Sequence, residues 1–435
     1  MLSLRPRVVI IGAGFAGVRA ARELANSNAE ILLIDQNNYH TFIPLLYQVA
    51  TAFISPEAIA YPIRRLLRRI PNAHFLMARA KGIDFSAKLV QTDSIGIFYD
   101  YLIVATGSQT QFLGVEGAPQ YALSLRTLED AVAIRNHILS CFERAAYVTE
   151  ESQRRQLLTF VIVGGGPTGV ELAGALIELI KQPLARDYPL IDPRQARVIL
   201  LHSGERLLGK LPEHLGNYTC RQLRRRGVRV HLQTRVSSVT PTAVELEDGN
   251  VIATSTVIWT AGVEANIPTD TAKLPTAKKN KIVVESTLQL PKQPHVYVVG
   301  DVAFVEQNGK PLIGVAPEAL QQGTAVAQNI KRQLQGRSPK PFEYFNKGRA
   351  AIIARNAGVA YLFGKMSFTG FFAWLLWLGI HLYYLPGWSN RWTVLASWIR
   401  DYFTRERTIR QIFPAQTSIL TNSNDLERQQ VKFDS

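Results

Sequence analysis

One pattern occurs twice in this chain: a short β-branched run, a glycine-rich turn and an Ala-rich helical stretch. The first copy is RVVIIGAGFAGVRAARELA (7–25) and the second is TFVIVGGGPTGVELAGALIELI (159–180). A strand that passes into a helix at a glycine turn is the beginning of a βαβ unit. Because 435 residues also exceed what one hydrophobic core usually organises, the sequence predicts an α/β protein with two Rossmann-like domains.

The first turn, GAGFAG, has the glycine spacing of a dinucleotide-binding loop. Gly12 permits the tight turn, Gly14 lets backbone amides approach a pyrophosphate, and Gly17 lets the helix pack closely on its strand. Asp35 ends the next strand, EILLID (30–35), where a ribose hydroxyl would be bound. The glycine pattern alone is a weak signal, but together with the strand, the helix and the acid it predicts a dinucleotide site.

The second turn, GGGPTG, repeats this logic and adds an acid just inside the next helix, with Gly164, Gly166, Gly169 and Glu171 as its members. The following strand, RVILLHSG (197–204), ends in His202 and Ser203, where a site for NADH usually places a carboxylate. The lack of a carboxylate, with Arg206 nearby, permits NADPH. We favour NADH, because lacking a repulsive group is not the same as having a binding one.

Later motifs indicate that one of the dinucleotides is a flavin. FYDYLIVATGS (98–108) and VIWTAGV (257–263) are strands that end in small-residue turns, which points to duplication of one nucleotide-binding architecture. HVYVVGDVA (295–303) places Asp301 directly after a strand, a position suited to hydrogen-bonding the ribityl chain of a flavin. We therefore expect FAD at the first site and NADH or NADPH at the second.

These motifs divide the chain into six segments. We expect a first part of the FAD-binding domain (1–115), a helical linker (116–157), the NAD(P)H-binding domain (158–265), the returning part of the FAD-binding domain (266–340), a C-terminal membrane-anchoring region that contains helices (341–413) and a disordered polar tail (414–435).

The C-terminal region differs in composition from the rest. Residues 366–390 carry no Asp, Glu, Lys or Arg, and an Arg- and Trp-rich helical run follows at 390–410. The apolar stretch is long enough to span a bilayer, but it contains Gly370, Gly379, His381 and Pro386. Because Trp, Tyr, Arg and Lys together prefer the headgroup boundary, we expect residues 366–410 to lie in a membrane interface. The alternative is a hydrophobic hairpin buried against the core or against a second copy in a homodimer.

Charge and cysteine content argue against several classes of protein. The net charge is +15, with its densest runs at RRLLRR (64–69) and RRR (224–226). Neither run has interleaved aromatics or a zinc pattern, so we interpret both as solvated helix faces and expect no nucleic-acid partner. Cys141 and Cys220 form no CxxC or CxxxxC, which indicates neither a disulfide framework nor a metal site. MLSLRPR leaves no room for a signal peptide before the first strand, so we expect the protein on the cytoplasmic side of a membrane.

Together these residues resemble the two-dinucleotide-binding flavoproteins and, among them, the type II NADH dehydrogenases, which are single-subunit NADH:quinone oxidoreductases. The resemblance extends to about Phe413, and its more selective elements are YHTFIPLLYQVAT (39–51), WTAGV (259–263), APEALQQG (316–323) and the Trp-rich C-terminal region. It implies that FAD is held by Gly12, Gly14, Gly17, Asp35, His40, Gly107 and Asp301. It implies that the nicotinamide coenzyme is served by Gly164, Gly166, Gly169 and Glu171, with His202 standing where the family has a carboxylate.

The resemblance also implies a reaction, in which a hydride passes from NADH or NADPH to FAD and two electrons then pass to a membrane quinone. Glu171, Gln321 and Gln322 would be the catalytic residues, the two glutamines lining the flavin and quinone pocket. No metal, covalent nucleophile or proton pumping is expected. The missing cysteines argue against a disulfide reductase and a sulfide:quinone oxidoreductase. A soluble NAD(P)H diaphorase or ferredoxin-type reductase and a regulator that binds NAD(P)H without turnover stay open as alternatives.

Overall fold

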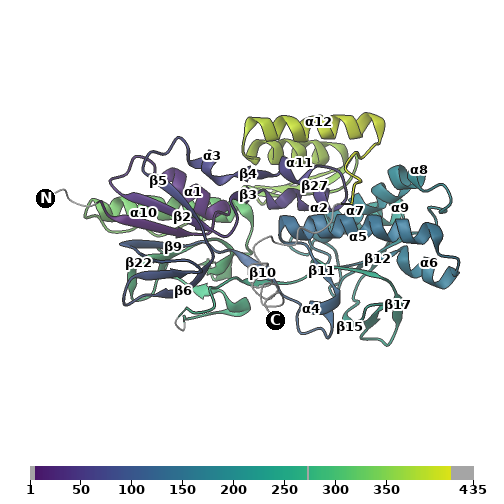
Figure 1. Cartoon of the computed structure of the whole chain (residues 1–435), viewed down its shortest axis with the longest axis horizontal. Coiled ribbons are helices and arrows are strands. Elements are labelled where there is room, and N and C mark those ends of the chain that lie inside the picture. The colour runs from purple at the N-terminus through teal and green to yellow at the C-terminus, as the bar shows by residue number, and fades with distance from the viewer. Residues whose placement is uncertain (1–4, 272–273, 413–435) are drawn as a thin grey trace, which may run out of the picture.

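The computed structural model describes residues 5–271 and 274–412, so the tail expected at 414–435 lies outside the described residues. Two parallel sheets lie next to each other along the long axis of the molecule, and a third layer of strands and helices spans them at the upper edge (Figure 1). The two Rossmann-like folds expected from the glycine turns are therefore confirmed.

The first sheet combines strands from distant parts of the chain. Its order is β21 (Gln289–Leu290), β22 (Gln293–Val298), β9 (Tyr101–Val104), β1 (Arg7–Ile11), β2 (Glu30–Asp35) and β5 (Ala73–Met77), and all but β21 are parallel. Side chains of β1 alternate between two cores, as the period of a strand requires. Val8 and Ile10 meet α1 (Phe15–Glu23) and α10 (Ala316–Leu334), while Val9 and Ile11 meet the small sheet β6 (Ala80–Asp84), β7 (Leu89–Thr92), β8 (Gly96–Phe98).

The second sheet repeats this plan. Its order is β11 (Leu123–Ser124), β18 (Thr256–Trp259), β12 (Thr159–Val163), β13 (Arg197–Leu201) and β14 (Val228–His231), all parallel. Phe160 and Ile162 face α5 (Leu128–Tyr147), α7 (Pro167–Leu179) and α9 (Glu213–Arg226), while Val161 and Val163 face β15 (Val236–Val239), β16 (Ala243–Leu246) and β17 (Val251–Ala253). The same layering in both halves is what duplication of one architecture predicts.

The connections between the halves are short and paired. β10 (Ser108–Thr110) leaves the first sheet and pairs antiparallel with β19 (Val263–Ala265), which returns from the second. The expected helical linker contains α4 (Ala118–Tyr121), α5 and α6 (Glu151–Leu157), but it also supplies β11 to the second sheet. The N-terminal half further contains β3 (Tyr39–Thr41), α2 (Leu46–Ala50), β4 (Ala60–Pro62) and α3 (Ile63–Leu67).

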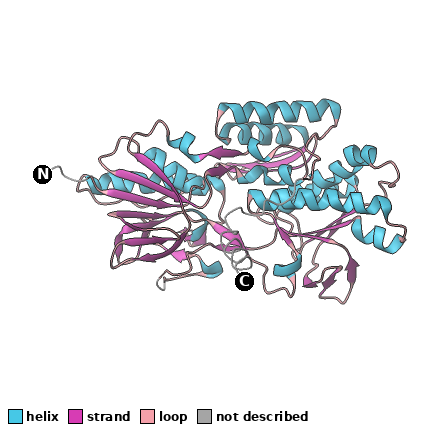
Figure 2. Cartoon of the chain, in the orientation of Figure 1, coloured by secondary structure: helices cyan, strands magenta, loops and turns pink. Residues whose placement is uncertain are grey.

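The C-terminal region contains the helices that the sequence predicts, but strands precede them. Its first part is an antiparallel sheet of β26 (Gly348–Ala354), β27 (Ala357–Leu362) and β28 (Met366–Thr369), and only then come α11 (Gly370–Tyr384) and α12 (Trp388–Thr404). The predicted run at 390–410 thus ends six residues early. Figure 2 shows the two helices at the upper edge with strands beneath them.

The C-terminal sheet packs directly on the second nucleotide fold. A Cβ built on Gly174 of α7 would lie 1.6 Å from the carbonyl oxygen of Ile353 in β26, so only glycine permits this approach. Among the described residues, no helix combines the length and the apolar character that crossing a bilayer needs.

Candidate active site

The first glycine loop has the shape that its spacing predicts. Gly12 takes φ +102°, and a Cβ there would lie 2.3 Å from the carbonyl oxygen of Ala105. A Cβ on Gly17 would lie 1.9 Å from the carbonyl oxygen of Gly12. A Cβ on Gly14, at the start of α1, would meet nothing within 4 Å. This open space before a helix N-terminus fits a pyrophosphate, which the free amides and the helix dipole favour.

The side chains of Asp35 and His40 hold this loop through hydrogen bonds to the backbone of Ala13. An Asp35 oxygen accepts a hydrogen bond from the Ala13 amide at 2.7 Å, and the other accepts from Asn37 at 2.8 Å. His40 is buried and its Nδ1 donates to the Ala13 carbonyl at 2.8 Å. Burial lowers the pKa of His40 to about 4, so the ring is neutral at physiological pH. Both side chains therefore bond Ala13, in the loop that would hold the dinucleotide.

Asp301 lies in the short turn after β22, and its carboxylate contacts Ser108, the residue after Gly107. Its carboxylate accepts hydrogen bonds from Ser108 Oγ and from Arg126 Nη2, both at 2.7 Å. Gly107 takes φ +74° and a Cβ there would meet open space. Sequence reasoning missed Ser108, which ends the motif 98–108, and Arg126, which belongs to no motif, because their proximity to Asp301 depends on the fold.

Hydrogen bonds connect both glutamines of α10, Gln321 and Gln322, to backbone groups of other segments. Gln322 is buried and its Oε1 accepts from the Gly300 amide at 2.6 Å. The Oε1 of Gln321 accepts from the Phe345 amide at 2.9 Å, and its Nε2 donates to the Phe345 carbonyl oxygen at 3.0 Å. Neither lines the cavity described below. Their described contacts are to backbone, and a catalytic role for them stays a prediction.

The second glycine loop has the same geometry as the first. A Cβ on Gly164 would lie 2.7 Å from Thr260 Oγ1 and one on Gly169 would lie 1.9 Å from the Gly164 carbonyl oxygen, whereas one on Gly166 would meet nothing within 4 Å. The His202 ring lies against this loop and its Nδ1 accepts from the Gly165 amide at 3.2 Å. Burial lowers the pKa of His202, so the ring is neutral at physiological pH. A neutral imidazole thus follows β13 at the place where the sequence shows no carboxylate, and a role for His202 in binding the coenzyme stays a prediction.

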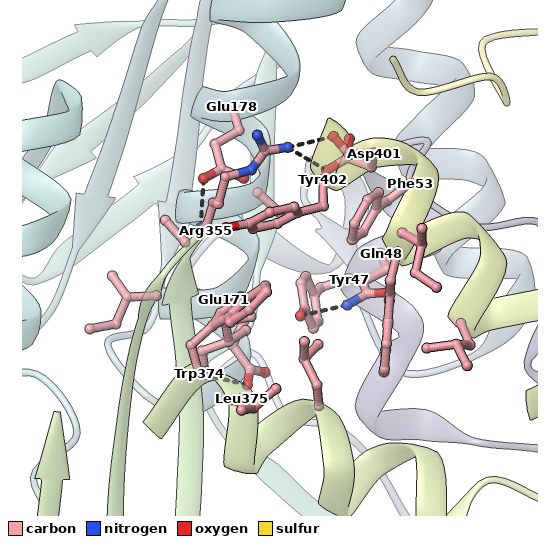
Figure 3. Close-up of a pocket in the computed structure, with 18 of the residues that line it drawn as sticks. Tyr47, Gln48, Phe53, Glu171, Glu178, Arg355, Trp374, Leu375, Asp401 and Tyr402 are labelled. Carbon is pink, nitrogen blue, oxygen red and sulfur yellow. Dashed lines mark hydrogen bonds and ion pairs between the residues drawn. The ribbon is translucent and has the colours of Figure 1, made fainter. Parts of the chain in front are cut away.

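A cavity of about 460 Å³ lies where α2 and α7 meet the C-terminal region. Figure 3 shows its labelled side chains converging from α2 and the loop after it, from α7, from the turn after β26, and from α11 and α12. Most of the wall is apolar, with Phe53, Trp374, Leu375, Leu378, Leu382, Leu395 and Ile399 among its members.

Glu171 forms one polar end of the cavity. Its Oε1 accepts from Trp377 Nε1 at 3.1 Å and from the Ile352 amide at 3.3 Å, and no described residue bonds Oε2. Burial raises the pKa of Glu171 to about 8, although both donors act against this. The carboxyl is therefore protonated at neutral pH. It lies in the second turn of α7 and faces the C-terminal region, which the sequence did not indicate.

Gln48 connects α2 to α12 at the same cavity. Its Nε2 donates to the Tyr47 hydroxyl at 2.9 Å, and its Oε1 accepts from Trp398 Nε1 at 2.8 Å. Sequence reasoning missed these three residues, although a lone glutamine within the apolar run 42–50 was the available signal.

A buried ion network forms the other polar end. Arg407 is 3% exposed and lies 3.4 Å from Glu178 and 3.8 Å from Asp401, and Arg355 pairs with Asp401 at 3.1 Å. Because losing one member would leave an unpaired buried charge, this network ties the end of α12 to α7 and β26.

Aromatic contacts bring the first glycine loop close to the cavity. Phe15 in that loop packs edge-on against Phe42, with ring centroids 5.7 Å apart, and Phe42 packs against His381 of α11 at 6.2 Å. His381 in turn stacks on Trp377 at 3.7 Å. A continuous series of side-chain contacts, through Phe42, His381 and Trp377, thus connects the first dinucleotide site to Glu171.

Two nucleotide folds, each with an open glycine loop at a helix start, define a class of protein that binds two dinucleotides. Residues 6–323 accordingly match the family described as pyridine nucleotide-disulphide oxidoreductase.

Among curated proteins, the type II NADH:quinone oxidoreductase Ndh of Mycobacterium tuberculosis is 38% identical over 93% of this chain and 89% of its own length. The type II NADH:quinone oxidoreductase of Staphylococcus haemolyticus is 30% identical over 83% of this chain and 90% of its own length. The structure of NDH2 from Plasmodium falciparum in complex with NADH superposes with a TM-score of 0.85 at 18% identity, covering 94% of this chain and 100% of that chain. This protein belongs to the type II NADH:quinone oxidoreductase family.

Proposed function

We propose that this protein oxidises NADH through bound FAD and reduces a quinone that reaches the cavity from a membrane. The cavity carries this proposal. Leu375, Ile399 and Phe403 line it and are also exposed on the molecular surface, at 52%, 51% and 78%. An apolar substrate dissolved in lipid can therefore enter between α11 and α12 without crossing water.

The two glycine loops assign the cofactors to the two halves. We propose that Gly12, Gly14, Gly17, Asp35, His40, Gly107 and Asp301 hold FAD, within a domain made of residues 1–115 and 266–340. We propose that Gly164, Gly166, Gly169 and His202 hold NADH, within residues 158–265. FAD, when bound, supplies a carrier that accepts a hydride and releases two electrons. The protein binds and orients the two dinucleotides, and the apolar wall of the cavity excludes water.

Glu171 is the proton-handling residue in this proposal. Below pH 8 its carboxyl is neutral, Oε1 is occupied by two donors, and Oε2 is left to carry the proton. A buried carboxyl with a pKa near physiological pH can donate a proton to a reduced quinone oxygen and recover it from solvent.

The C-terminal helices are proposed to lie in the membrane surface. On α12 the exposed side chains Trp388, Trp392, Ile399 and Phe403 recur at helical spacing, while Val394 and Trp398 on the opposite side are buried. On α11 the exposed side chains Phe372, Leu375 and Tyr383 also recur at helical spacing. Such an aromatic stripe suits a monotopic helix pair on the cytoplasmic side of a bilayer. A homodimer through this face is the competing use of the same surface.

The cavity can be tested by filling it. Gly379 lines it, and a Cβ built there would meet nothing within 4 Å, so Gly379→Leu fits the helix but occupies substrate space. We expect KM for a quinone analogue to rise at least tenfold, while reduction of the flavin by NADH in single-turnover absorbance measurements stays as in the native protein. Ala396→Leu on the exposed side of α12 adds the same volume outside the cavity and should change neither quantity.

Other outcomes would contradict the proposal. If Gly379→Leu leaves quinone kinetics unchanged, the quinone does not use this cavity. If the native protein shows one stoichiometric reduction by NADH and no turnover with quinones, it is a binding protein or a reductase of another acceptor. Faster flavin reduction by NADPH than by NADH would show that His202 and Arg206 form a site for a 2′-phosphate.

A further inference from the structure

The arginine run 64–69 lies on a short helix with a clear division of faces. In α3 and the residues after it, Ile63, Leu66, Leu67 and Ile70 are buried, while Arg64, Arg65, Arg68 and Arg69 are exposed. None of the ion pairs among the described residues involves these arginines. Two of them pack on rings instead, Arg64 on Phe75 and Arg65 on Tyr61. The run is a solvated face, as expected from the sequence, but four like charges are concentrated on it.

This cluster adjoins the start of α12. Asn390 in the first turn of α12 donates to the carbonyl oxygens of Glu57, Ala58 and Ala60, at 3.0 to 3.2 Å. The Tyr61 ring lies so close to Gly387, between α11 and α12, that a Cβ there would be 2.1 Å from it. α3 begins two residues after Tyr61, and Figure 1 places it beside β4 and the near end of α12. The arginines therefore stand at the edge of the exposed aromatic surface.

We propose that Arg64, Arg65, Arg68 and Arg69 form a docking rim for the headgroups of an anionic lipid bilayer, adjoining the apolar face of α11 and α12. This inference rests on the membrane-surface placement proposed above and adds a preference for lipid charge.

The chemistry of the two surfaces is complementary to that of one partner. Trp388, Trp392 and Tyr383, exposed at 74%, 64% and 71%, are the side chains that favour the boundary between acyl chains and headgroups. Guanidinium groups beside such a stripe meet phosphate oxygens at headgroup depth. From residue 55 to residue 71 the charged side chains are these four arginines and Glu57, so the local charge is strongly positive. An apolar protein partner would explain the aromatic surface but not the charge at its edge.

The preference is measurable with vesicles. The full FAD-loaded protein is sedimented with vesicles of phosphatidylcholine alone or mixed with phosphatidylglycerol, at low salt. An arginine near an anionic surface strengthens binding about 5-fold, so Arg68→Gln with Arg69→Gln should weaken binding to the mixed vesicles about 25-fold. Binding to phosphatidylcholine alone, which depends on the apolar face, should stay unchanged. Raising the salt should remove the preference of the native protein, because exposed charges are screened.

A matched control removes two charges elsewhere. Lys81 in β6 and Lys88 in the turn after it are exposed, and Figure 1 places β6 at the edge opposite α12. Lys81→Gln with Lys88→Gln should leave lipid preference intact. The rim is refuted if the arginine variant keeps the full preference for phosphatidylglycerol, or if the lysine variant loses as much of it. NADH oxidation with a water-soluble quinone should be equal in all three proteins, so failure of the rim is distinguished from failure of the catalytic proposal.

Discussion

Replacing Trp377 by phenylalanine removes one of the two hydrogen bonds to Glu171 and leaves an aromatic ring in its place. The Trp377 indole lies 3.1 Å from Glu171 Oε1, and the other donor is the Ile352 amide at 3.3 Å. A hydrogen bond from a neutral donor stabilises the carboxylate more than the protonated acid. Its loss should therefore raise the pKa of Glu171 above its native value of about 8.

The size of this increase follows from the strength of the bond. Hydrogen bonds to charged groups contribute about 1.5 to 3 kcal/mol, and one pKa unit corresponds to about 1.4 kcal/mol, so the increase is roughly 1 to 2 units. The substitution leaves unchanged the other titratable and charged residues that line the cavity with Glu171, which are Tyr47, Glu178, Arg355, Asp401 and Arg407. His381, which stacks on Trp377, is neutral because burial lowers its pKa to about 4. The change can thus be attributed to Trp377.

The assay is the pH dependence of kcat/KM for a quinone analogue. If the protonated carboxyl is the active form, kcat/KM of the native protein falls as the pH rises through about 8. In Trp377→Phe the same fall should occur at a pH roughly 1 to 2 units higher. Trp398→Phe is the matched control, since Trp398 is another buried tryptophan of the same helix pair but donates to Gln48. It should lose a similar amount of stability and keep the native pH profile. Identical profiles in all three proteins, or equal changes in both variants, would refute the reasoning.

Three further predictions concern the fold and the cofactor site. Glu171→Gln should flatten the pH dependence of the free energy of unfolding between pH 4.5 and 8. The native carboxyl binds a proton on folding there, so native stability falls as pH rises, which denaturant titrations measure. Gly174→Ala should destabilise the protein by about 1 to 3 kcal/mol, because its Cβ would overlap the Ile353 carbonyl, and calorimetry should show a lower Tm than for Gly379→Ala. Gly14→Ala should fold with a native Tm in the apoprotein yet retain less flavin by absorbance, because a Cβ would fill the open space before α1 without touching the protein.

The glycine turns and parallel strands were predictable because their information is local. Gly12 and Gly164 need backbone conformations that glycine alone adopts readily, and a β-branched run before each turn predicts a buried parallel strand. The donors to Glu171 could not be predicted in this way, since Trp377 lies 206 residues further along the chain and reaches it through packing. For Gln321, the motif predicted a position near the start of a helix, but it could not predict that the side-chain amide bonds the backbone of Phe345.

The close packing of β26 on α7 limits how this protein can be shortened. The donors to Glu171 come from β26 and α11, and Gly174 has no side chain to cover the surface that β26 occupies. A chain cut before residue 341 would keep both glycine loops but expose one face of α7 to water, and with it a carboxyl that would then ionise at ordinary acidic pH. The C-terminal region, which we propose lies on a membrane surface, therefore also forms a wall of the cavity, and grafting it onto an unrelated carrier would not restore the truncated protein.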